Sequence, residues 1–181
     1  LGGRVVGIGD HTAAFYDEAG IDIPKALAWV AENRVLTGFG APEIPRDALL
    51  LSACDVLIPA ALGDVLTAEV AKEVRCKLVV EAANGPTTPD GDEVFHARGI
   101  DVVPDIFANA GGVTVSYFEW AQNIQQFAWE RGRVDAELDR LMKRAFARLS
   151  ETRRQHGIDW RTAAFVRAID RVKYASDVRG Y

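Results

Sequence analysis

Short apolar runs separated by segments of helical periodicity dominate residues 1–110. The apolar runs predict buried strands at 4–10, 55–59, 77–83 and 100–103. Apolar residues at helical spacing predict helices at about 24–34, 67–75 and 92–98, while 11–20 and 38–45 read as connections and 48–53 is too short to classify. Asp22 and Thr67 can cap the first two of these helices. Strands that alternate with helices in this way are typical of a parallel, doubly wound α/β sheet.

Helical periodicity takes over after residue 116. An apolar stripe predicts one long helix, and it consists of Leu138, Leu141, Met142, Ala145, Phe146 and Leu149. Core packing explains Met142 and Phe146 better than a cofactor role does. Gly157 is expected to end this helix, and Asp159 to cap a last helix that ends near Gly180.

The composition limits the class of protein. The chain has 181 residues, 49% hydrophobic and 26% charged, which suits one globular domain over 1–181 and leaves no apolar run long enough to span a bilayer. The net charge of -5 and the acids interleaved among the arginines of 131–179 argue against a nucleic-acid partner. Cys54 and Cys76 lie in apolar stretches without metal-ligand spacing. We therefore expect no metal site, and two buried free thiols in a reducing, cytoplasmic compartment.

The segment 109–120, with the sequence N-A-G-G-V-T-V-S-Y-F-E-W, carries the densest group of candidate site residues. Gly111 and Gly112 follow an apolar run and precede an amphipathic segment, which predicts a strand-to-helix corner where a backbone can approach a ligand. Asn109 offers a donor and an acceptor, and Ser116 lies about one helical turn past Val113 on the same side of a helix. The alternative is a glycine-containing turn that only allows a helix to start.

Three loops that follow apolar strands are predicted to open on one edge of the sheet, and they are 59–63, 84–88 and 109–113. Ligands of open α/β sheets bind outside the carboxyl ends of the strands, so these loops predict a nucleotide site. Asp10 ends the first apolar run, where an acid can bond a ribose hydroxyl. Two alternatives stay open: Asp10 as a turn-forming residue, and the asparagines Asn84 and Asn109 as left-handed turn positions beside glycine.

Three segments resemble the cofactor domain of glutamate dehydrogenase. They are C-D-V-L-I-P-A-A-L-G at 54–63, E-A-A-N-G-P-T-T at 81–88 and N-A-G-G-V-T-V-S-Y-F-E-W-A-Q-N at 109–123. The resemblance covers essentially the whole chain. Related leucine, phenylalanine and valine dehydrogenases share the N-A-G-G-V core but usually lack the N-G-P-T-T loop and the S-Y-F-E-W continuation. The resemblance implies a doubly wound, mostly parallel, Rossmann-like sheet followed by C-terminal helices, with a βα-alternating part over 1–110 and a helical part over 111–181.

The resemblance also implies roles for individual residues in binding NAD, with NADP as the alternative. Asp10 would face the adenosine ribose, and Ala60 and Ala61 would lie along the cofactor. Asn84 would bond near the nicotinamide ribose, and Asn109 would hold the nicotinamide carboxamide. The charge of an acid at position 10 disfavours the 2'-phosphate of NADP, which favours NAD.

The substrate implied by the resemblance is L-glutamate, oxidatively deaminated in a reversible reaction to 2-oxoglutarate and ammonium. Val113 and Ser116 would line the pocket for its side chain, with the Ser116 hydroxyl donating to the distal carboxylate. The family assembles as a homohexamer, which makes a homo-oligomer the expected partner.

Two departures from the family pattern stand out. The glycine-rich phosphate turn and the first strand of the sheet would precede residue 1, and the chain holds no counterpart of the catalytic lysines and aspartate of the family. We therefore expect a piece of a longer polypeptide that is inactive by itself, with no catalytic residue of its own. In the strand order 3-2-1-4-5-6 the missing strand would lie between the runs ending at Asp10 and Pro59, so that another segment fills the gap or the two strands close up. The alternatives are a non-catalytic nucleotide-binding or assembly module, and a dehydrogenase for a branched or aromatic amino acid.

Overall fold

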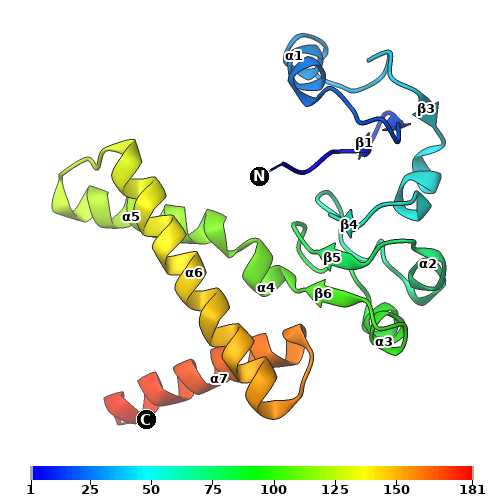
Figure 1. The fold of residues 1–181 in the computed structure, drawn as a ribbon. Coiled ribbons are helices and arrows are strands. Elements are labelled where there is room, and N and C mark those ends of the chain that lie inside the picture. The colour runs from blue at the N-terminus through cyan, green and yellow to red at the C-terminus, as the bar shows by residue number, and fades with distance from the viewer. Residues whose placement is uncertain (1, 181) are drawn as a thin grey trace.

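The computed structural model describes residues 2–180 and contains a parallel three-stranded sheet flanked by helices (Figure 1). Its strands, in the order β4-β5-β6, are β4 (Val56–Leu57), β5 (Leu78–Val80) and β6 (Asp101–Val103). Both strand pairs are parallel. The connecting helices are α2 (Ala68–Glu73) and α3 (Pro89–Ala97). The predicted α/β class and the order of these elements are confirmed, although each strand is shorter than its apolar run.

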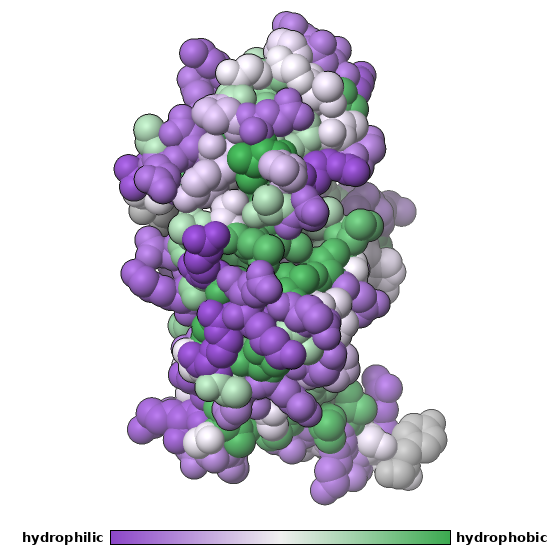
Figure 2. Space-filling view, turned by 90° about the vertical axis from the view of Figure 1, so that its right-hand side faces the viewer, coloured by the Kyte–Doolittle hydropathy of each residue, from purple (hydrophilic) through white to green (hydrophobic). Residues whose placement is uncertain are grey.

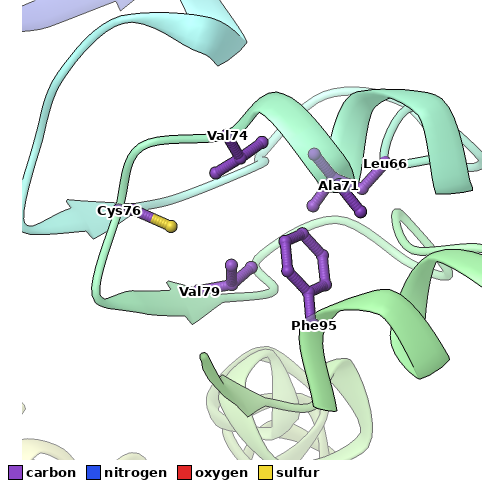
Figure 3. Close-up of a cluster of buried hydrophobic side chains, with 6 residues drawn as sticks. All are labelled: Leu66, Ala71, Val74, Cys76, Val79 and Phe95. Carbon is purple, nitrogen blue, oxygen red and sulfur yellow. The ribbon is translucent and has the colours of Figure 1, made fainter. Parts of the chain in front are cut away.

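The main hydrophobic core lies between this sheet and its two helices (Figure 3). Phe95 of α3 is fully buried against Val79 of β5 and Ala71 of α2. Burying a phenylalanine side chain contributes about 1.5–3 kcal/mol, so this contact fixes α3 on the sheet. Cys76 is buried in the same core and Cys54 is half-buried beside it, and both thiols are free. Burial raises the pKa of each thiol.

Residues 7–44 form a second sheet that is antiparallel. Its strands, in the order β1-β2-β3, are β1 (Gly7–Gly9), β2 (Ala14–Tyr16) and β3 (Glu43–Ile44). The prediction that 11–20 is only a connection is wrong, because β2 lies within it. The signal was weak, since the strand has only three residues and none of them is β-branched. Helix α1 (Ile23–Asn33) follows, and its predicted cap is confirmed: the Asp22 side chain accepts a hydrogen bond from the Lys25 backbone N–H.

A 3-10 helix, η1 (Arg46–Leu51), joins the two sheets. The Leu49 side chain lies against Gly7 and Gly9 of β1, and the Tyr16 hydroxyl donates to the Ala53 carbonyl at 3.0 Å. At the level of η1 and α2, apolar residues form a band across an otherwise largely hydrophilic face (Figure 2).

Neither solution expected for the missing central strand is present among residues 2–180. β1 and β4 are each an edge strand of a separate sheet, they do not pair, and no described strand lies between them. The antiparallel hairpin of β1 and β2 is stabilised locally instead, by hydrogen bonds to the Asp10 side chain at its turn.

The C-terminal part is helical, as predicted, and extends away from the parallel sheet (Figure 1). Its helices are α4 (Asp105–Ala108), α5 (Ala110–Gln125), α6 (Arg131–His156) and α7 (Trp160–Arg179). Gly157 ends α6 with a φ of 63°, and the Asp159 side chain caps α7 by accepting from the Thr162 N–H, so both predicted boundaries are confirmed. None of the helices in the described part of the chain is both long and apolar enough to cross a membrane.

Aromatic packing holds α6 against its neighbours. The Phe146 ring stacks on Trp160 of α7 with centroids 5.5 Å apart, and it also contacts Phe107 of α4 at 5.8 Å. Leu149 is buried in the same cluster. The packing interpretation of Phe146 is therefore supported by its contacts.

Candidate functional site

The loop after β4 is bound to the loop after β5 through the backbone. The Pro59 carbonyl accepts hydrogen bonds from the N–H groups of Ala82 and Ala83, at 3.1 and 2.9 Å. The Asp64 N–H donates to the Gly85 carbonyl at 2.8 Å. These bonds confirm that the first two predicted loops share one edge of the sheet.

The loop after β5 is bound in turn to the segment after β6. The Asn109 Nδ2 donates to the Asn84 Oδ1 at 2.7 Å, although the two residues lie 25 positions apart. The Gly85 N–H donates to the Asp105 Oδ2, also at 2.7 Å. All three predicted loops therefore meet, and the two asparagines singled out from the sequence are in direct contact.

The corner expected at Gly111 and Gly112 is placed differently. A short helix, α4, follows β6, and the chain turns between α4 and α5 at Asn109, with φ -95° and ψ 1°. Both glycines lie in the first turn of α5 rather than in a loop. The strand-to-helix corner is instead at Pro104, because a proline cannot donate to the sheet and favours the first turn of a helix.

The left-handed alternative for the asparagines is wrong. Neither Asn84 nor Asn109 has a positive φ, and Gly85 takes the left-handed conformation instead, with a φ of 55°. The side chains of both asparagines therefore serve contacts between loops rather than local turn geometry. A Cβ at Gly112 would meet no atom within 4 Å, so the backbone at the start of α5 is open to the approach of another molecule.

Small residues line the neighbouring loop. Ala60 and Ala61 follow the buried Pro59 and are both exposed. Gly63, which sequence reasoning did not single out beyond its loop, allows the closest approach. A Cβ at Gly63 would lie 3.2 Å from the Asn84 carbonyl oxygen and 3.3 Å from that of Gly85.

Val113 and Ser116 lie on α5 and are both exposed, with 70% of Val113 accessible. The Ser116 hydroxyl donates to the Gly112 carbonyl at 3.2 Å. This bond is local, so the hydroxyl can rotate toward an incoming acceptor without unfolding the helix.

Asp10 forms a tight turn in the antiparallel sheet. Its carboxylate accepts from the N–H and hydroxyl of Thr12, at 2.7 and 2.6 Å, and from the N–H groups of Ala13 and Leu36, at 3.0 and 2.9 Å. Burial raises the pKa of this carboxyl, but these hydrogen bonds outweigh it and leave the pKa well below its usual range. The structure thus bears out the turn-forming alternative, and the ribose role stays a prediction.

A charged cluster that none of the sequence predictions included lies beneath the edge. The guanidinium of Arg161, in the first turn of α7, binds Glu81 at 2.7 Å and Asp92 at 2.8 Å. Burial alone would lower the pKa of Arg161, but the hydrogen bonds from the two carboxylates raise it further above its usual value. One signal could have revealed the cluster: Glu81 ends an apolar strand, where a buried acid needs a cation.

Other features lie away from this edge. A shallow hollow of about 310 Å³ near the C-terminal end of α5 is lined by Glu119, Gln122, Asn123, Gln126, Phe127 and Ala128. Within residues 2–180, no group of three His, Cys, Asp or Glu side chains is arranged to hold a metal ion.

The sequence that forms these loops matches a known protein family over almost its entire length. Residues 1–180 fit the model of the Glutamate/Leucine/Phenylalanine/Valine dehydrogenase family. The chain belongs to this family. It is 44% identical over 181 residues to the glutamate dehydrogenase of Thermotoga maritima, covering 99% of this chain and 44% of that protein.

Solved structures of this family share the fold. The glutamate dehydrogenase of Peptoniphilus asaccharolyticus is 36% identical with a TM-score of 0.81, over 99% of this chain and 42% of that one. The hetero-hexameric glutamate dehydrogenase of Thermus thermophilus is 26% identical with a TM-score of 0.91, over 98% of this chain and 42% of that one. The chain therefore spans less than half the length of these family members.

Proposed function

We propose that this chain is the cofactor-binding portion of a glutamate dehydrogenase, which reversibly converts L-glutamate, NAD and water into 2-oxoglutarate, ammonium, the reduced cofactor and a proton. The observation that carries the proposal is the contact between Asn84 and Asn109 where three loops meet at the carboxyl edge of the parallel sheet. The 44% identity to a glutamate dehydrogenase favours glutamate over the other amino acids of the family.

The asparagine pair suits the nicotinamide carboxamide. The bond between the two side chains uses one hydrogen of the Asn109 amide and the oxygen of Asn84. The Asn109 oxygen can therefore accept from the carboxamide NH₂, while the Asn84 NH₂ can donate to the ribose. The bound cofactor supplies the hydride acceptor, and these residues orient its reactive ring.

The exposed face of α5 suits the substrate side chain. Val113 offers an apolar surface for the methylenes of glutamate, and the Ser116 hydroxyl can turn from the Gly112 carbonyl to the distal carboxylate. A carboxylate is the better acceptor, because hydrogen bonds to an ionised group are roughly twice as strong as those between neutral groups.

This chain supplies no catalytic lysine under the proposal. Lys77 pairs with Asp55 at 2.7 Å and Lys143 pairs with Asp139 at 2.8 Å, and all four side chains are exposed at the surface. By resemblance, the family's catalytic groups and glycine-rich turn are expected outside this chain, and we therefore propose that the isolated chain is inactive.

NAD is the favoured cofactor and NADP the alternative, because the Asp10 carboxylate stays ionised and repels a 2'-phosphate. The complete protein is proposed to be a cytoplasmic homohexamer. A second candidate is a non-catalytic nucleotide-binding or assembly module, which the loop geometry would serve equally well without the missing catalytic groups.

Replacing Ser116 by alanine in the complete polypeptide tests whether glutamate is the substrate and whether Ser116 binds its distal carboxylate. We expect kcat/KM for glutamate to fall by the equivalent of about 1.5–3 kcal/mol, and that for norvaline, which lacks the distal carboxylate, to change far less. Thr114→Ala is the matched control, because its hydroxyl also bonds a carbonyl one turn back on α5. Equal losses on both substrates would remove the proposed role of Ser116 and favour another amino acid as the substrate.

A further inference from the structure

Arg161 connects the last helix to the edge that carries the asparagine pair. Its guanidinium bonds both oxygens of Glu81, at 2.7 and 3.1 Å, and reaches Asp92 of α3 at 2.8 Å. It also lies 3.8 Å from Asp105 at the start of α4. Glu81 is fully buried and Arg161 is only 22% exposed, so this pair is largely shielded from water.

Two of these carboxylates, Glu81 and Asp105, also accept backbone hydrogen bonds from the loops of the site. The Glu81 Oε2 accepts from the Asp105 N–H at 2.8 Å, which fixes the start of α4 against the end of β5. The Asp105 Oδ2 accepts from the Gly85 N–H at 2.7 Å. Gly85 follows Asn84 directly, so ion pairs and carboxylate hydrogen bonds connect α7 to the loop that carries Asn84.

The composition of the cluster points to positioning rather than to stability alone. A buried ion pair often contributes no more to stability than an apolar pair of similar volume, because desolvation offsets its attraction. Here three carboxylates surround one guanidinium, and two of them, Glu81 and Asp105, lie one residue after β5 and two residues after β6. A planar guanidinium with several donors can fix such groups at set distances.

We propose that Arg161 and Asp105 are positioning residues that hold the loop of Asn84 and Gly85 against Asn109 for the nicotinamide end of the cofactor. The inference rests on the proposed function. Arg161 acts through Glu81 and Asp105, and Asp105 acts through its bond to the Gly85 N–H. Neither side chain is required to touch the cofactor.

Replacing Asp105 by alanine in the complete polypeptide tests this inference, because it removes the acceptor of the Gly85 N–H and leaves the pairs of Arg161 with Glu81 and Asp92 in place. The probes are NADH, which has the nicotinamide ring, and ADP-ribose, which lacks it. We expect the affinity for NADH to fall about fivefold or more, while that for ADP-ribose stays within about twofold.

Two further variants make the result specific. Asp105→Asn keeps an oxygen acceptor for Gly85 and is expected to restore NADH affinity to within about twofold of the wild type. Asp101→Ala, at the other end of β6, breaks an ion pair with Arg153 of 2.8 Å that has no link to the asparagines, and should leave both affinities unchanged.

The outcomes separate this inference from the proposed function. Equal losses for NADH and ADP-ribose, no loss for Asp105→Ala, or no rescue by Asp105→Asn would overturn the positioning role while wild-type binding of NADH stands. A wild-type protein that binds neither NADH nor NADPH would overturn the proposed function, and the inference with it.

Discussion

At the scale of single residues, the asparagines were predictable and their charged support was not. Asn84 and Asn109 each follow an apolar strand and precede small residues, so the topology of a parallel sheet placed them on one edge. Their direct contact bears out that argument. Arg161 could not be found in this way, because a helical arginine 80 positions from Glu81 is indistinguishable in sequence from the solvated arginines around it.

Asp10 gives a residue-scale prediction that depends on pH. Its folded pKa is depressed, so its carboxylate stabilises the fold above its unfolded pKa of 3.8, and this contribution is lost as pH falls below that value. Asp10→Asn should lower the free energy of unfolding by about 1 kcal/mol at neutral pH, with the difference shrinking below about pH 4.

Denaturant titration of both proteins across pH measures this effect. Glu18→Gln, at an exposed acid just beyond β2, is the control and should change the unfolding free energy by less than about 0.5 kcal/mol. A constant difference between wild type and Asp10→Asn down to pH 3 would contradict the assignment.

At the scale of elements, the caps of three helices were predicted correctly, whereas the start of α3 and the strand β2 were not. The helix expected over 92–98 begins at Pro89, behind a Thr88 cap. Asp22, Thr67 and Asp159 each accept a backbone N–H of the helix that follows, because their side chains reach the first turn. The hairpin strand β2 was missed because its stability comes from burial of Phe15 and from the turn at Asp10 rather than from its own pattern.

Two glycines in helical first turns should respond in opposite ways to alanine. A Cβ at Gly91 of α3 would overlap the Leu66 carbonyl, so Gly91→Ala is expected to destabilise the fold by about 1–3 kcal/mol. A Cβ at Gly132 of α6 meets no atom within 4 Å, so Gly132→Ala should be neutral or stabilise by up to about 1 kcal/mol. Thermal unfolding of the two variants checks this, and a stabilising Gly91→Ala would contradict the packing of α3 on the loop before α2.

At the scale of the whole molecule, the parallel sheet and the C-terminal helices follow the sequence prediction, but the strands of the N-terminal sheet do not pair with those of the parallel sheet. Because no strand within residues 2–180 lies between β1 and β4, the hydrogen-bonding groups of the two edges stay separate. The predicted division at 110 and the ribose role of Asp10 stay predictions.

The ion pairs of Arg161 also attach α7 to the end of β5 and to α3. Arg161→Gln leaves the fully buried Glu81 without a cation, so we expect a loss of about 3–5 kcal/mol in unfolding free energy. Lys77→Gln removes an ion pair of the same 2.7 Å length whose side chains are 84% and 79% exposed, and should lower the unfolding free energy far less, because water screens the pair. Equal losses in chemical denaturation would show that burial of the Glu81 pair does not matter.

The central claim is that Asn109 holds the nicotinamide of a glutamate dehydrogenase. The most direct measurement is the initial rate of glutamate-dependent NAD reduction by the complete polypeptide, compared between wild type, Asn109→Ala and the control Asn123→Ala near the other end of α5. We predict that the wild type forms 2-oxoglutarate, that Asn109→Ala lowers kcat/KM at least about tenfold through misplacement of the ring, and that Asn123→Ala stays within about twofold. A wild type that reduces neither NAD nor NADP with glutamate, or an Asn109→Ala variant as active as Asn123→Ala, would contradict the claim.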